Sequence, residues 1–184
     1  DDQDGFEKSI GGEPFGAAVY FSEKREAQGS YPARDGAAVK VEAWQILSPV
    51  RVHLHGVDSL NRMIQGRFRK RALAWAEPEV YYHRKVPKPF GPQRILYGDK
   101  IISVRNGRRY KVWPKPGEPP YIANGDMGVA VGQYKTKALK GLPWKLEIEF
   151  RSQRGFKIDY FDSEFGDEGS GAPLELAYAL TVHK

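Results

Sequence analysis

The chain has 184 residues, 40% hydrophobic and 12% aromatic, which is the composition of a folded domain and not of a disordered segment. It contains no cysteine, which excludes a disulfide framework, a thiol nucleophile and a thiolate metal site. The net charge of +6 suits nucleic acid, an anionic membrane surface or an acidic protein, although many soluble domains carry such an excess without any of these partners.

The absence of cysteine also fits a reducing compartment, and we expect a cytoplasmic protein. No apolar run approaches the roughly 18 residues of a membrane-spanning helix, and the first ten residues are acidic where a signal peptide would be basic. We therefore expect a soluble chain with no membrane partner. It lacks an initiator Met and stops after an apolar segment at Lys184, so we expect a piece of a longer protein.

The first half of the chain alternates between short apolar runs and breaker residues. Residues 1–15 are acidic and rich in glycine, and we expect them to be a frayed lead-in. Residues 17–21 form a short apolar run, and residues 39–47 alternate and then become continuously apolar, which is typical of a strand that enters a sheet core. Ser48 and Pro49 end that strand.

A helix is predicted from Gly56 to the residue before Pro78. Its apolar positions fall on one stripe, formed by Val57, Leu60, Met63, Ile64, Phe68, Leu73 and Trp75. The other face is strongly basic and reads as the solvated side of an amphipathic helix, with Arg62, Arg67, Arg69, Lys70 and Arg71.

Beyond this helix the pattern changes to strands. Prolines 87, 89 and 92 exclude helix, and short alternating runs introduced by Gly-Asp and Asn-Gly-Asp turns follow. Five such runs predict a compact barrel or rolled sheet, at 101–104, 110–113, 127–134, 145–150 and 156–161. The final segment, which begins at Pro173, is compatible with a short helix or a buried strand.

The stretch from 84 to 115 is rich in cations and contains a single acid, Asp99. Aromatic residues are interleaved with the cations. Rings stack on unpaired bases while cations neutralise phosphates, so this composition suits single-stranded nucleic acid, although we expect several of the rings to be core. The cations that we assign to DNA binding in this part of the chain are Lys100, Arg105, Arg108 and Arg109.

No motif in the chain indicates catalysis on its own. The spacing Gly-x4-Gly-Lys-Ser/Thr of a phosphate-binding loop is absent, and GDEGSG at 166–171 has the wrong glycine order and is acidic. His53 and His55 lie two apart, but no third metal ligand is evident. No Ser-His-Asp set or carboxylate pair stands out from its spacing.

Three segments in chain order resemble the carboxy-terminal region of RecD-like DNA helicases, which are superfamily-one relatives of UvrD. WQILSPVR (44–51) and GVDSLNRMIQ (56–65) resemble the motif IV strand and helix. GDKIISVRN (98–106) and NGDMG (124–128) resemble the small Src-homology-3-like barrel inserted in the second RecA-like domain. LAYALTVHK (176–184) is similar to the start of motif V, which in the family continues with Ser-Gln-Gly.

The resemblance implies ATP-driven translocation along single-stranded DNA by the parent helicase. By matching positions, Thr181, His183 and Lys184 would lie on the DNA track or couple it to ATP, and Arg51 would approach the nucleotide. A satisfied core histidine is the alternative for His183. Because the phosphate-binding loop and the Mg-binding acidic motif are missing, we expect ATP and Mg to act only in the full-length parent and no hydrolysis by this chain alone.

The predicted fold class is a β-rich α/β fragment of a RecA-like motor domain with the inserted barrel. Residues 1–80 would belong to the motor domain, 81–170 to the barrel and 171–184 to the return into the motor domain. The expected partners are single-stranded DNA, the remainder of the helicase chain and a second copy that covers open sheet edges. The alternative is a non-catalytic protein-docking or structural module whose basic surface only confers solubility.

Overall fold

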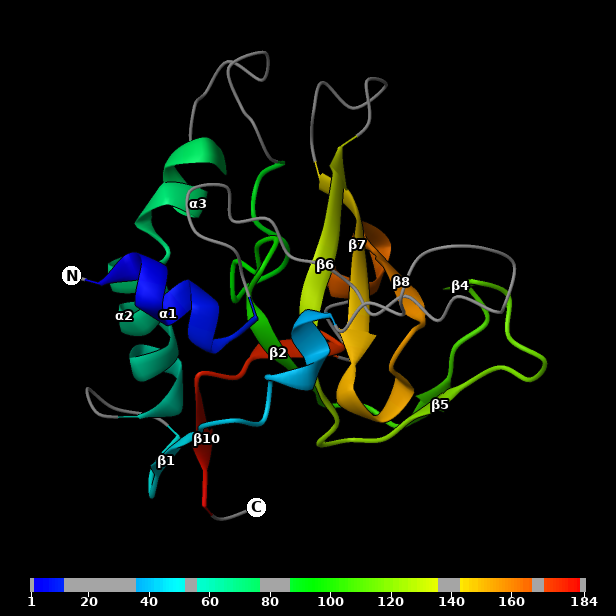
Figure 1. The fold of residues 1–184 in the computed structure, drawn as a ribbon, viewed down its shortest axis with the longest axis horizontal. Helices are drawn as coiled ribbons and strands as arrows, with labels where there is room; N and C mark the ends of the chain where they lie inside the picture. Colours follow the sequence, from blue (N-terminus) through cyan, green and yellow to red (C-terminus); the bar gives the residue numbers. More distant parts are fainter. Residues whose placement is uncertain are drawn as a thin grey trace, which may run out of the picture.

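The structure is a computed structural model that describes residues 2–11, 36–51, 56–76, 87–135, 143–166 and 171–182. These residues form a mixed α/β fold, mostly sheet, with helices on one side (Figure 1). Its helices are α1 (Gln3–Ser9), α2 (Val57–Phe68) and α3 (Lys70–Ala76), with short 3-10 turns η1 (Ala37–Val39), η3 (Arg151–Gln153) and η4 (Asp162–Phe165). Its strands are β1 (Ile46–Ser48), β2 (Lys100–Ser103), β3 (Gly107–Arg108), β4 (Val112–Trp113), β5 (Tyr121–Ile122), β6 (Met127–Lys135), β7 (Pro143–Phe150), β8 (Lys157–Phe161), β9 (Leu174–Leu176) and β10 (Ala179–Thr181).

Six strands form one antiparallel sheet in the order β4-β8-β7-β6-β2-β9. Its central strands were predicted because their apolar residues alternate, and the structure confirms strands over 145–150 and 156–161. The alternating side chains enter the main core, which contains Leu146, Ile148, Phe150, Ile158 and Tyr160. Alternation identified these strands because every second side chain of a strand points to the same face.

The six-stranded sheet is open in the described part of the chain, so the predicted closed barrel is not found. The outer strands β4 and β9 each pair with one neighbour, β8 and β2 respectively. Between β2 and β6 the chain forms a separate two-stranded ribbon, β3 with β5. These two strands pair with each other instead of lying between β4 and β9, where strands that close a barrel would lie.

A parallel pair, β1 with β10, lies beside the helices (Figure 1). Asn61 of α2 attaches the helix to β10: its Nδ2 donates to the carbonyl oxygens of Leu176 (2.9 Å) and Ala179 (3.1 Å), and its Oδ1 accepts from the Ala179 amide (2.8 Å). The final segment is therefore strand, and the strand expected over 39–47 is confined to Ile46–Ser48, preceded by η1.

The single helix expected from Gly56 to Pro78 is interrupted at Arg69, which separates α2 from α3. Arg69 leaves helical geometry, with φ −115° and ψ 24°. Its side chain is 1% exposed, so the prediction that it lies on the solvated face is wrong. The break turns this cation towards carboxylates in the interior, where burial of a guanidinium requires partners.

The lead-in expected to be frayed contains an ordered helix, α1. The Asp2 carboxylate caps it by accepting from the Gly5 amide at 2.8 Å. The Phe6 ring stacks on Phe68 of α2 with centroids 4.7 Å apart, and Glu7 is buried. The apolar and charged contacts that order α1 are made with residues distant in the sequence, so the composition of residues 1–15 does not reveal them.

Candidate nucleic-acid interface

A pocket of about 110 Å³ lies where the β3–β5 ribbon meets the end of β8. It brings together three of the four barrel cations that the sequence predicted to bind DNA: Arg105, Arg108 and Arg109. The other lining residues are Ser103, Asn106, Gly107, Ile122, Tyr160, Glu164 and Pro173. Arg105 lies in the turn between β2, which ends at Ser103, and β3, which begins at Gly107. Arg108 is the last residue of β3, and Arg109 follows it directly.

Arg109 is held tightly within this pocket. Its two terminal nitrogens donate to both carboxylate oxygens of Glu164, at 2.8 and 2.9 Å. Nη2 also donates to the Asp159 carbonyl oxygen (2.7 Å), and the guanidinium lies 4.0 Å from the centroid of the Tyr160 ring. Burial by itself lowers the pKa of Arg109, but the hydrogen bonds and charges of its neighbours outweigh burial and raise it. The Arg109 charge is thus neutralised within the chain.

Arg105 and Arg108 make a different kind of contact. Arg105 donates to the carbonyl oxygen of Gly171, and Arg108 donates to that of Pro119 at 3.0 Å. A carbonyl oxygen orients a guanidinium but supplies no compensating charge. Among the described residues, no carboxylate forms an ion pair with Arg108. The pocket therefore keeps a positive charge that an external anion can use.

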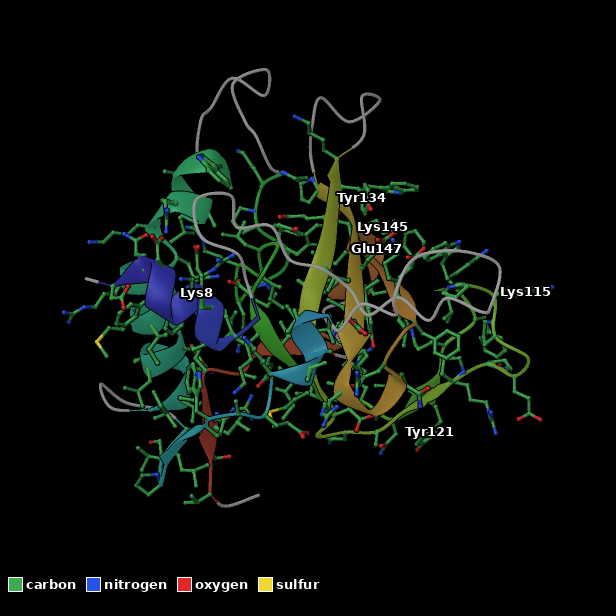
Figure 2. The ribbon with its side chains drawn as sticks, viewed as in Figure 1. Lys8, Lys115, Tyr121, Tyr134, Lys145 and Glu147 are labelled. Carbon is green, nitrogen blue, oxygen red and sulfur yellow. The ribbon has the colours of Figure 1, made fainter. Side chains whose placement is uncertain are left out.

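Exposed aromatic rings lie close in sequence to the arginines of the pocket or opposite them in the β3–β5 ribbon. Tyr110, Trp113 and Tyr121 are 77%, 58% and 51% exposed, whereas Phe90 is fully buried. Tyr121 pairs with Arg108 across the ribbon, so a ring and a cation are cross-strand neighbours. Figure 2 shows Tyr121 on the β5 side of the molecule, away from the helices. Large exposed rings beside cations are the chemistry that single strands require.

Exposed lysines extend this surface. Lys111 and Lys115 lie in the segment between β3 and β5, and Figure 2 shows Lys115 at the edge of the molecule. The partly buried Lys157 ammonium lies 4.9 Å from the centroid of the Trp113 ring and forms an ion pair with Glu147 at 3.1 Å. We call the surface formed by the pocket, the exposed rings, Lys111 and Lys115 the arginine-aromatic arm.

Lys100, the fourth predicted DNA-binding cation of the barrel, does not lie on this surface. It is fully buried, its Nζ donates to the Trp44 carbonyl oxygen at 2.6 Å, and it lies 4.6 Å from the centroid of the Trp44 ring. Burial lowers its pKa to about 8. The assignment of Lys100 to a surface track is therefore corrected: β2 turns its side chain into the interior, where it joins the sheet to the segment before β1.

Arg51 and Thr181, which were predicted from motifs IV and V, do not line this pocket. Arg51 forms an ion pair with Glu175. Thr181 is partly buried at the end of β10, opposite Ser48 at the end of β1. The carboxyl ends of these two parallel strands therefore meet, which is where ligands bind in open α/β sheets. His183 and Lys184 lie outside the described residues, as do His53 and His55.

The sequence did not reveal two features of the charge arrangement. Glu164 lies in a segment that reads only as an acidic loop, yet it neutralises Arg109. Arg69 contacts Glu7 (3.0 Å) and Asp99 (3.3 Å) in the interior. No short-range pattern reports these three pairs, because the partners are 55, 62 and 30 positions apart.

No protein-family model matches the sequence, and a search of curated proteins found no match. The resemblance to RecD-like helicases thus remains a prediction from the motifs. The described residues contain no helix long and apolar enough to cross a membrane. Across the same ranges, no group of three or more histidines and acids is arranged to hold a metal ion.

Proposed function

We propose that this chain binds single-stranded DNA and is the strand-binding part of a RecD-like helicase. One observation carries the binding proposal: Arg108 is exposed at a pocket lined by three arginines, forms no ion pair with a carboxylate of the described residues and lies beside exposed rings. Cations neutralise the phosphates, and exposed rings stack on bases. A duplex hides the faces of its bases, so the same surface favours an unpaired strand.

The helicase part of the proposal is supported by how the motif segments are arranged. The segments that resemble the motif IV strand and helix form β1 and α2, and the segment similar to the start of motif V forms β10, which is parallel to β1 and held to α2 by Asn61. A parallel strand pair with a helix packed on it is the unit from which α/β nucleotide-binding sheets are built. Hydrolysis is not assigned to this chain, because its sequence contains no phosphate-binding loop.

The test is fluorescence anisotropy of a labelled oligo-dT with the folded chain at low and moderate salt. The variant Arg108→Ala/Tyr121→Ala removes one cation and the ring opposite it, and we expect affinity to fall about tenfold or more and the salt dependence to weaken. Arg62→Ala, which removes an exposed cation of α2, is the charge-matched control and should retain nearly full affinity.

The protein-docking alternative gives a different result in the same titration. Exposed rings such as Trp113 also suit protein contacts. No binding of oligo-dT at low salt by a chain that circular dichroism shows to be folded would overturn the proposal and favour docking. Equal loss in the Arg62→Ala control would mean that affinity reports only net charge, which would also overturn assignment to the arginine-aromatic arm.

A further inference from the structure

Three arginines line one pocket, but only one of them is neutralised by a carboxylate of the pocket itself. Glu164 accepts from both terminal nitrogens of Arg109, at 2.8 and 2.9 Å. Arg108 instead donates to the Pro119 carbonyl oxygen and forms no ion pair with a carboxylate of the described residues. A carboxylate and a phosphate both present paired oxygens to a guanidinium fork, so Glu164 occupies on Arg109 the position that a phosphate would take.

We infer that Glu164 is a built-in competitor for backbone phosphate, so that Arg108 binds the strand while Arg109 stays paired with Glu164. This inference rests on the proposed single-strand binding. It assigns Glu164 the role of setting how many phosphates the pocket neutralises, and it makes Arg109 a phosphate ligand only when Glu164 releases it.

The geometry keeps Arg109 in place when Glu164 is neutralised. Arg109 still donates to the Asp159 carbonyl oxygen at 2.7 Å and still lies over the Tyr160 ring. The ion pair is also near solvent, with the Arg109 side chain 22% and the Glu164 side chain 28% exposed. A phosphate can therefore approach the pair without the core opening.

Glu164 has a second contact that a test must preserve. Its Oε1 accepts from the Phe161 amide at 2.9 Å, which orders the turn after β8. Glu164→Gln keeps an oxygen for this amide and removes only the charge. The matched control is Glu118→Gln, which removes an exposed acid from the same arm but frees no arginine.

The experiment measures oligo-dT anisotropy over a range of salt concentrations for the wild type, Glu164→Gln and Glu118→Gln. We expect Glu164→Gln to bind several-fold tighter, with the slope of log K against log salt steeper by about 0.7, as for one more neutralised phosphate on a single strand. Glu118→Gln should change the affinity less and leave the slope unchanged.

A further variant connects the gain to Arg109. Adding Arg109→Ala to Glu164→Gln should abolish the gain in affinity. The slope of log K against log salt should become shallower by about 0.7 and so return to the wild-type value. If the double variant keeps the steeper slope, or if Glu164→Gln binds no tighter than Glu118→Gln, the competitor role is overturned while wild-type binding stands. If the folded wild type does not bind at low salt, the proposed function itself fails.

Discussion

The chain uses arginine in two opposite ways, in the interior at Arg69 and at the surface in the pocket around Arg108. Arg69 is 1% exposed and contacts the carboxylates of Glu7 and Asp99, which are fully buried. Arg108 is exposed and donates to the Pro119 carbonyl oxygen. The comparison teaches that the partners of a guanidinium, and not its place in a basic stretch, decide whether it stabilises the fold or remains available to an anion.

The interior site shows how many hydrogen-bond donors surround a carboxylate that is buried with an arginine. Asp99 accepts from the Tyr178 hydroxyl (2.8 Å), from Gln65 Nε2 (2.6 Å) and from the Leu96 amide (2.8 Å), in addition to Arg69. Burial still raises the pKa of Asp99, although Arg69 and these donors act to lower it. Burial likewise raises the pKa of Glu7, against the charge of Arg69. The Arg69 guanidinium thus favours the charged form of both carboxyl groups, while burial opposes it.

The largest effect is expected from Arg69→Met, which removes the cation and leaves two carboxylates buried. We expect the free energy of unfolding to fall by about 3–5 kcal/mol, because breaking a buried pair by removing one partner leaves uncompensated charge. Urea unfolding followed by circular dichroism measures the change. The loss should be smaller at acidic pH, where the carboxyl groups take up protons.

The control for this variant is Arg62→Met, which changes an exposed arginine of α2, the helix that ends directly before Arg69. It should alter the free energy of unfolding by no more than about 0.5 kcal/mol. A loss below about 1 kcal/mol in Arg69→Met would break the comparison, because the interior arginine would then behave like a surface one.

The second prediction concerns Lys100, the buried cation that contacts no carboxylate among the described residues. Its pKa is lowered from an ordinary 10.5 to about 8 by burial. Between these values the unfolded chain binds more protons at this site than the folded chain, so folding stability should rise with pH. Between pH 8 and pH 10 the gain is about 2 kcal/mol.

Urea unfolding at a series of pH values tests this, with Lys100→Met as the reference that cannot titrate. The difference between the two proteins isolates Lys100 from other groups, including Tyr178 and Tyr160, whose pKa values are raised by burial and which therefore cost stability above pH 10. Parallel stability profiles for wild type and Lys100→Met would show that the ammonium does not titrate in this range.

The smallest effect on stability is expected from Arg108→Ala. Its hydrogen bond joins an exposed side chain to the Pro119 carbonyl oxygen, so the free energy of unfolding should change by no more than about 0.5 kcal/mol. Oligo-dT affinity should nevertheless fall. Urea unfolding and anisotropy on the same sample measure both, and a loss above about 1 kcal/mol in stability would make Arg108 a structural residue.

The strands were predictable because alternation is local. Leu146, Ile148 and Phe150 are every second residue, and this spacing is enough to indicate one buried face. The break at Arg69 was not predictable in this way. Its carboxylate partner Glu7 lies 62 positions away in a segment whose composition indicates a frayed end, so neither half of the pair suggests the other.

The site was predicted in part, and the reason is similar. Arg105, Arg108 and Arg109 stand within five residues of one another, in the turn after β2 and at the end of β3, so their placement at one pocket follows from their closeness in the sequence. Lys100 stands in the same basic stretch and is nevertheless buried. Successive side chains of a strand point to opposite faces, and the adjacent Ile101 is buried in the main core. Lys100 is buried as well because the segment that contains Trp44 covers its face of β2.

The sequence by itself determined the alternation of the central strands, the cation-rich stretch with its interleaved rings and the lack of a phosphate-binding loop. Only the tertiary structure decided which cations are interior, which are neutralised and which face solvent. Local pattern controls which side chains share a face. The burial of a charge instead depends on partners such as Glu7 for Arg69 and Glu164 for Arg109, which distant segments bring into contact when the chain folds.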